Sequence, residues 1–136
     1  EMASLRSNGT WVLEDLPAGA KPIPVKWVFK IKRDAKGNIE RFKARLVAKG
    51  FMQVEGRDFT ETFAPVSQHA TMRTLLSVTA ERDLELHHLD VKTAFLNGIL
   101  EESIYMKQPP GYEEGGPNTA CHLVKSLYGL RQAPRA

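Results

Sequence analysis

Apolar and polar side chains alternate along two neighbouring stretches of the chain, residues 25–32 and 39–48. Between them, residues 34–38 combine Asp, Gly and Asn, which are residue types that favour a tight turn. A period of two on both sides of a turn predicts an antiparallel β-hairpin. The apolar positions are Val25, Trp27, Phe29 and Ile31 before the turn, and Phe42, Ala44, Leu46 and Ala48 after it.

The register of this hairpin follows from the phase of the two patterns, because the apolar positions are odd before the turn and even after it. The apolar faces match only if directly opposed residues have numbers that sum to an odd number. The same register sets basic side chains opposite one another on the second face, where like charges destabilise a hairpin. We therefore expect that second face to bind an anion. The opposed pairs that this register predicts are Phe29 with Ala44 and Trp27 with Leu46 on the apolar face, and Lys30 with Lys43 and Lys32 with Arg41 on the second face.

The rest of the chain predicts one amphipathic helix and several shorter strands. Residues 72–80 carry apolar side chains at helical spacing, and Ser67 or Thr71 is in place to cap the helix. Residues 84–91 predict a strand that delivers Asp90, and the Asn-Gly pair at 97–98 interrupts it. Further strands are predicted at 11–16, 104–107 and 122–125, turns at 55–58 and 127–136, and the start of a helix at Pro134.

The length predicts one domain over residues 1–136, and the predicted elements indicate an α+β fold with the helix packed on an antiparallel sheet. The chain is 42% hydrophobic and 26% charged, which is typical of a soluble globular protein. No apolar run approaches the roughly 20 residues that span a bilayer, and the start of the chain lacks a signal pattern. Cys121 is the only cysteine, which excludes an internal disulfide and is typical of a reducing compartment.

Charge is distributed unevenly along the chain. Residues 21–49 hold ten Lys or Arg residues against Asp34 and Glu40, a net charge of +8, so that the total of +3 leaves −5 for the remainder. A basic lobe beside an acidic remainder indicates a polyanionic partner at one place. Composition alone also fits an ordinary solvated charged face.

Residues 89–98 carry the strongest candidate chemistry. Asp90 ends an apolar run, and Phe95 follows five positions later. A polymerase palm needs a carboxylate to hold a catalytic metal and an aromatic beside the incoming sugar, whereas the simpler alternative is that Asp90 caps a turn or a helix. His87 and His88 are adjacent, so on a strand they point to opposite faces and do not share a metal ion.

Eight ordered blocks of the sequence resemble the reverse transcriptase domain of copia-type retrotransposon Pol polyproteins. One block alone is a weak signal, whereas eight in order are highly specific. The blocks are residues 8–11, 26–30, 42–51, 62–66, 89–98, 104–106, 108–112 and 127–135.

The resemblance implies roles for individual residues in nucleotidyl transfer. Asp90 matches the first metal-binding aspartate of the palm, with the Val91 carbonyl as a second ligand. Phe95 matches the aromatic that excludes a ribose 2′-hydroxyl; the alternative is a core phenylalanine packed on the helix at 72–80. Gln132 matches the glutamine that packs against the nucleotide sugar.

The resemblance also assigns the basic hairpin to the polymerase fingers, which close over the nucleotide and the template. Arg45 matches the arginine that grips the incoming triphosphate, and Lys43 assists it. Lys30, Lys32 and Arg41 on the same face are then expected to bind nucleic acid.

The intact enzyme implied by the resemblance uses Mg²⁺ or Mn²⁺, deoxynucleotides and a primed RNA or DNA template. Its partners are the remainder of the Pol polyprotein: the second half of the palm, the thumb, ribonuclease H and integrase, with no membrane. Residues 1–136 contain no Asp-Asp pair, so we expect a partial domain that stops before that motif and is inactive alone. The alternatives are a non-catalytic nucleic-acid-binding remnant and a decayed transposon copy.

Overall fold

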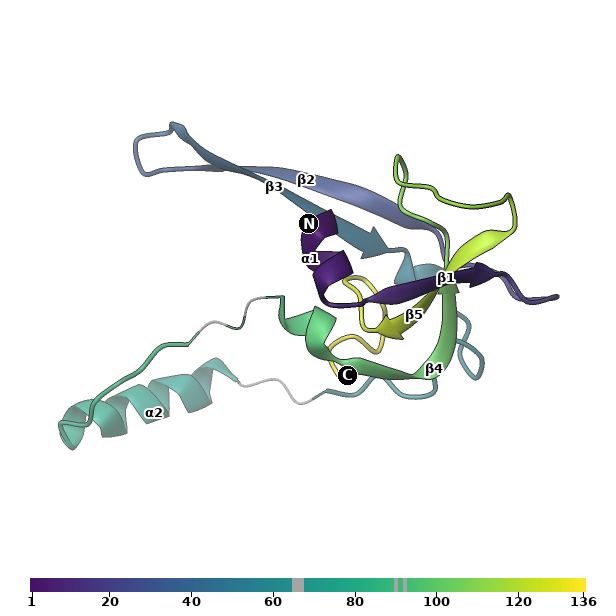
Figure 1. Cartoon of the computed structure of the whole chain (residues 1–136). Coiled ribbons are helices and arrows are strands. Elements are labelled where there is room, and N and C mark those ends of the chain that lie inside the picture. The colour runs from purple at the N-terminus through teal and green to yellow at the C-terminus, as the bar shows by residue number, and fades with distance from the viewer. Residues whose placement is uncertain (65–67, 90, 92) are drawn as a thin grey trace.

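The computed structural model describes residues 1–64, 68–89, 91 and 93–136, and shows a small α+β domain with two antiparallel sheets (Figure 1). One sheet has three strands in the order β1-β5-β4, and the other is the hairpin β2-β3. The elements in chain order are α1 (Met2–Ser7), β1 (Trp11–Asp15), β2 (Val25–Arg33), β3 (Ile39–Ala48), η1 (Gly50–Met52), α2 (His69–Glu81), η2 (Ala94–Asn97), β4 (Ile99–Met106) and β5 (Thr119–Lys125).

The predicted hairpin and its register are confirmed. Phe29 lies opposite Ala44, and the four other pairs that run from Val25 to Phe29 and from Ala44 to Ala48 keep the same register. The strands extend away from the three-stranded sheet (Figure 1). At the turn, the carboxylate of Asp34 accepts hydrogen bonds from the backbone N–H groups of Lys36 and Asn38, both at 2.9 Å.

The three-stranded sheet confirms the strands predicted near 11–16, 104–107 and 122–125, although β4 begins earlier, at Ile99. β5 is the central strand and pairs with both neighbours. Helix α1, which the sequence patterns did not predict, places Leu5 in the core. The predicted turn at 55–58 is present, with the Gly56 N–H bonded to the Phe59 carbonyl.

The two sheets meet where the chain enters β2. The Ile23 N–H donates to the Tyr105 carbonyl at 2.8 Å, and the Lys107 N–H donates to the Ile23 carbonyl at 2.9 Å, so Ile23 extends the edge of β4. One buried cluster then runs from the base of the hairpin into the three-stranded sheet. It contains Leu5, Ile23, Val25, Leu46, Ala48, Leu96, Ile104, Met106, Cys121, Leu123, Leu127, Leu130 and Ala133.

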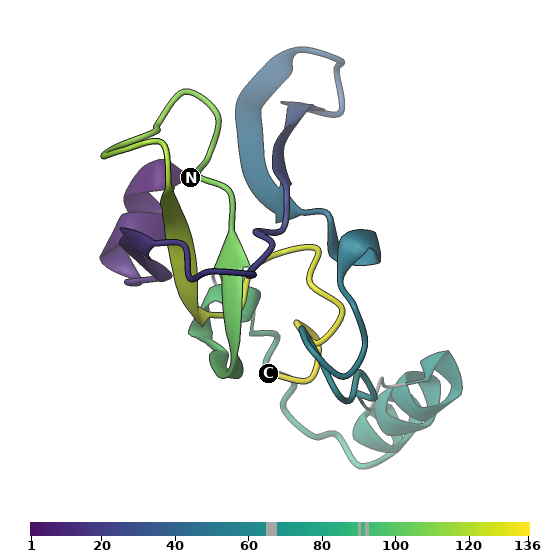
Figure 2. The same cartoon turned by 90° about the vertical axis from the view of Figure 1, so that its right-hand side faces the viewer.

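Helix α2 confirms the helix prediction, but the predicted packing of this helix on a sheet is wrong. None of its residues is buried, and Leu75 in its apolar stripe is 62% exposed. Figures 1 and 2 both show α2 apart from the two sheets. Gln68 is the N-cap residue and makes no side-chain capping bond; Thr71 lies inside the helix, and Ser67 lies outside the described residues.

Two further predictions are corrected. Residues 84–89 form no strand, because an extended segment needs a neighbouring strand to pair with and no described strand pairs with them. Residues 127–136 form successive turns rather than the start of a helix at Pro134, with the Ala136 N–H bonded to the Gln132 carbonyl. Within the described part of the chain, no helix has the length and apolar character needed to cross a membrane.

Candidate nucleic-acid interface

One face of the hairpin carries six Lys or Arg side chains, with Val28 and Val47 between them. Opposed residues of an antiparallel pair point to the same side, and the register sets Lys30 opposite Lys43 and Lys32 opposite Arg41. Among the described residues, none of these side chains forms an ion pair. We call this surface the basic face; its residues are Lys26, Lys30, Lys32, Arg41, Lys43 and Arg45.

The charges of the basic face repel one another, and Lys43 shows the effect. The neighbouring guanidinium of Arg45 lowers the pKa of the Lys43 ammonium below its ordinary value, partial burial adds to the shift, and Lys32 and Arg41 contribute in the same direction. An anion bound at this face would relieve that repulsion. The electrostatics therefore suit a phosphate.

Arg45 and Phe95 lie on different elements but meet the same aromatic ring. The Arg45 guanidinium carbon is 5.7 Å from the centre of the Tyr128 ring, within the range of a cation–π contact. The Phe95 ring packs edge-on against Tyr128, with centroids 5.2 Å apart and planes at 69°. The two residues that the sequence assigns to the triphosphate and the sugar are thus brought together.

Phe95 does not pack on the helix at 72–80, which was the alternative to its role beside the sugar. Its ring partner is Tyr128, and it rests against the buried core, whereas helix α2 buries no residue. The proposed partner for a structural Phe95, the helix at 72–80, is therefore wrong. Sequence reasoning did not single out Tyr128; the available signal was an aromatic residue directly before Gly129, at a turn.

Backbone contacts fix the segment that carries Tyr128 against the end of β3. The Ala48 N–H donates to the Tyr128 carbonyl at 2.8 Å. Gly129 has φ +90°, and a Cβ there would lie 2.2 Å from the Ala48 carbonyl oxygen. Only glycine combines that conformation with that approach. The close passage at Gly129 therefore sets where the Tyr128 ring can lie.

Gln132 is held inside the protein by both ends of its amide. It is 2% exposed; Nε2 donates to the Asp58 carbonyl at 2.9 Å, and Oε1 accepts from Gln53 Nε2 at 3.0 Å. Gln53 Oε1 in turn accepts from the Arg131 N–H at 2.8 Å. Gln132 thus joins residues 53–58 to the C-terminal turns, and its contact with a nucleotide sugar stays a prediction.

The predicted metal ligands are not assembled in the described residues. Asp90 lies outside them, and the described Val91 is 65% exposed. His87 and His88 are exposed, and no group of three or more His, Cys, Asp or Glu side chains comes together in the described ranges. The residues in place therefore do not complete a site for Mg²⁺ or Mn²⁺.

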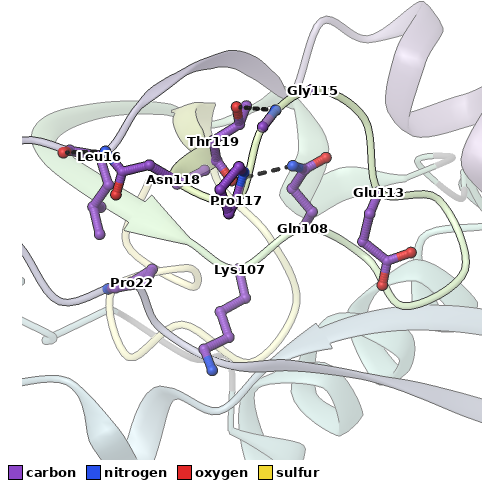
Figure 3. Close-up of a pocket in the computed structure, with 11 residues that line it drawn as sticks. Leu16, Pro22, Lys107, Gln108, Glu113, Gly115, Pro117, Asn118 and Thr119 are labelled. Atoms are coloured by element: carbon purple, nitrogen blue, oxygen red, sulfur yellow. Dashed lines mark hydrogen bonds between the residues drawn. The ribbon is translucent and has the colours of Figure 1, made fainter.

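A separate cavity of about 530 Å³ lies between the 113–119 loop and the edge of the three-stranded sheet (Figure 3). Gln108 holds this loop: its Nε2 donates to the Glu114 and Thr119 carbonyls, and its Oε1 accepts from the Glu114 N–H. Lys107 and Glu113 supply the charged groups in its wall. None of the predicted site residues lines this cavity, so it is distinct from the basic face.

Residues 8–136 match the family model described as reverse transcriptase (RNA-dependent DNA polymerase). A Pol polyprotein from the tobacco transposon TNT 1-94 (Nicotiana tabacum) is 56% identical over 136 residues, which is 99% of this chain and 10% of that protein. The Pol polyprotein from the Arabidopsis thaliana transposon RE1 is 44% identical over 131 residues, 95% of this chain and 9% of that protein.

A shorter relative is an uncharacterized mitochondrial protein of Arabidopsis thaliana, 45% identical over 84 residues, which is 62% of this chain and 49% of that protein. No solved structure matches the chain. The chain spans about a tenth of the length of the Pol polyproteins it matches.

Proposed function

Because the chain belongs to the reverse transcriptase (RNA-dependent DNA polymerase) family, we propose that it forms the fingers and the first half of the palm of an RNA-directed DNA polymerase. The two relatives that match nearly the whole chain are retrotransposon Pol polyproteins. The proposed reaction is nucleotidyl transfer from a deoxynucleoside triphosphate to a primer 3′-hydroxyl. The partners are a primed RNA or DNA template and the remainder of the polyprotein: the second palm half, thumb, ribonuclease H and integrase.

The observation that carries the proposal is the meeting of Arg45 and Phe95 at Tyr128. A guanidinium offers a planar fork of donors that suits the oxygens of a triphosphate. The Phe95 ring, which packs on the same tyrosine, can occupy the space that a ribose 2′-hydroxyl would need. We therefore assign the triphosphate and the sugar of a deoxynucleotide to residues that contact one ring.

The basic face supports the second half of the proposal, which is template binding. Lys30, Lys32 and Arg41 continue from Arg45 toward the hairpin turn, along one side of the two strands. Such a row of cations can neutralise phosphates of a nucleic-acid backbone and release their counterions. We assign Arg45 and Lys43 to the nucleotide, and the three residues nearer the turn to the nucleic-acid backbone.

For the complete polymerase we propose Mg²⁺ or Mn²⁺. Nucleotidyl transfer with two metals needs several carboxylates. From this chain the proposed ligands are Asp90 and the Val91 carbonyl, and the remaining carboxylates belong to the rest of the polyprotein.

The test is primer extension by the complete polymerase with Asp90→Asn. We expect the substitution to abolish extension while template-primer binding persists, because it removes a metal ligand but no basic residue. Asp83→Asn is a matched control: it makes the same change seven residues earlier, at a residue whose φ of 49° asparagine tolerates. Extension that survives Asp90→Asn, or extension by the 136-residue chain alone, would contradict the proposal.

A further inference from the structure

We infer that Tyr128 is a positioning residue for the incoming nucleotide, holding Arg45 at the triphosphate and Phe95 at the sugar through one ring. The inference rests on the proposed function and extends it to a residue with no chemistry of its own. If it is right, triphosphate affinity and sugar selection are coupled through Tyr128. Neither property would then belong to Arg45 or Phe95 alone.

The backbone ties both partners of the ring to the segment that carries it. Arg45 lies three residues before Ala48, whose N–H is bonded to the Tyr128 carbonyl. Phe95 lies three residues before Gly98, whose carbonyl accepts from the Ser126 N–H at 2.7 Å. Residues 126–128 therefore serve as a common support for β3 and η2, which are separate elements. The backbone of β3 and that of η2 are thereby both tied to the segment that carries Tyr128.

The ring contact also suits the work that Arg45 would do. A cation–π contact occupies no hydrogen-bond acceptor, so the N–H donors of the guanidinium that do not face the ring remain free for a phosphate. Within the described residues, the Arg45 side chain makes no hydrogen bond and no ion pair. Holding a long side chain in place before binding reduces the entropy lost when the ligand arrives.

Phe95 is held by the buried core as well as by the Tyr128 ring. Its neighbour Leu96 is fully buried, and the Leu96 N–H is bonded to the Thr93 carbonyl, which fixes η2 against the core. Phe95 is half-buried, and its edge-on contact with Tyr128 limits how far its ring can turn. A steric gate works only if its ring stays in place when a ribonucleotide presses on it.

The experiment measures nucleotide kinetics of the complete polymerase with Tyr128→Leu and Tyr128→Phe. We expect Tyr128→Leu to raise the KM for a deoxynucleotide about fivefold, corresponding to about 1 kcal/mol, with a smaller change in kcat. We expect it also to reduce discrimination against the matching ribonucleotide about fivefold. Tyr128→Phe keeps the ring and should restore both values. Tyr112→Leu is the matched control, because the Tyr112 ring packs beside Trp27 and not beside Arg45 or Phe95. This control should change neither the KM nor the discrimination against the ribonucleotide.

A double-mutant cycle separates positioning from general packing. After Arg45→Ala, Tyr128→Leu should no longer raise KM, and after Phe95→Val it should no longer change discrimination. Additive effects, or a Tyr128→Phe variant as impaired as Tyr128→Leu, would overturn the inference. If Arg45→Ala and Phe95→Val themselves leave KM and discrimination unchanged, the proposed function has failed instead.

A direct reading of the geometry comes from the NMR spectrum of the 136-residue chain. The side-chain protons of Arg45 should show an upfield ring-current shift that Tyr128→Phe preserves and Tyr128→Leu removes. Arg45 protons that keep the same shift in Tyr128→Leu would overturn the ring contact, whatever the kinetics show.

Discussion

The hairpin β2-β3 and the helix α2 both lie outside the three-stranded sheet, but only the hairpin is supported by the core (Figure 1). The two strands of the hairpin pair with each other, and its base enters the core, where Leu46 is fully buried. Helix α2 has a clear apolar stripe, yet none of its residues is buried. The repeating pattern predicted both of these elements, but it did not predict that the described residues lack a surface for α2 to pack on.

The physical reason lies in the distance to that partner along the chain. Strand β3 follows β2 after a turn of five residues, so the two strands that pair with each other are adjacent in the sequence. The stripe of α2 needs a surface supplied by some other segment, and no described segment provides it. Met72, Leu75 and Leu76 are accordingly exposed.

The largest expected difference between the two regions is in amide hydrogen exchange of the 136-residue chain. A helix of 13 residues without tertiary packing is marginal in water, so its amides should exchange within about tenfold of an unstructured peptide. The Ala48 amide, bonded to Tyr128 at the base of the hairpin, should exchange only through global or nearly global unfolding. Equal protection in α2 and at Ala48 would break the comparison, because α2 would then be packed.

Leucine-to-alanine substitutions compare the hairpin with α2 by their effect on the free energy of unfolding. Leu46→Ala should lower the free energy of unfolding by about 2–5 kcal/mol, because it opens a cavity at a fully buried position. Leu75→Ala, the matched change in α2, should stay within about 0.5 kcal/mol. Urea denaturation followed by circular dichroism gives both values. A loss at Leu75 as large as that at Leu46 would contradict the exposed placement of α2.

These two regions also show how far the sequence alone predicts the fold. The hairpin register followed from odd and even positions, since residues such as Phe29 and Ala44 are opposed across a local turn. The pairing of β1 with β5 links residues about a hundred positions apart, and no local pattern specifies it. Residues 84–89 were predicted as a strand from their leucines at 84, 86 and 89, but pairing requires a partner strand that their own sequence does not encode.

The candidate site divides in the same way. The sequence assigned Arg45 and Phe95 individually, by resemblance, and their contacts now give a reason for the pairing. Tyr128 escaped sequence reasoning because its importance comes from two neighbours, 83 and 33 residues away, that only the fold brings together. Gln132 was assigned to a ligand, whereas its amide is occupied by protein groups whose positions no pattern reveals.

Nucleic-acid binding of the 136-residue chain should also distinguish the hairpin from the helix. If Lys30 and Lys32 each contact a phosphate, the double change to Gln should flatten the slope of log affinity against log salt by about 1.4–1.8. Arg73 and Arg82 lie in and just after α2, and changing both to Gln removes the same net charge. We expect this control pair to leave the slope nearly unchanged. The measurement is a salt titration on one oligonucleotide.

Equal flattening by the two pairs would show that affinity follows net charge, not the basic face. A slope that neither pair changes would remove the hairpin from the binding surface altogether.

The smallest expected effect is a pH dependence confined to the hairpin turn. Hydrogen bonds from the Asn38 side chain, then from its backbone N–H, lower the pKa of the Asp34 carboxyl below its ordinary value of 3.8, with smaller contributions from the N–H groups of Lys36 and Gly37. Because the folded pKa is depressed, the charged carboxylate stabilises the turn above the unfolded-state pKa, and this stabilisation disappears as the pH falls through the folded value. The amide resonances of Lys36 and Asn38 should therefore move together in an NMR titration, with a midpoint below 3.8, while the α2 resonances do not follow that midpoint. Asp34→Asn keeps an acceptor for the turn but has no titrating carboxyl, so it should abolish the transition. A midpoint at or above the ordinary value would mean that these bonds do not hold Asp34 in solution.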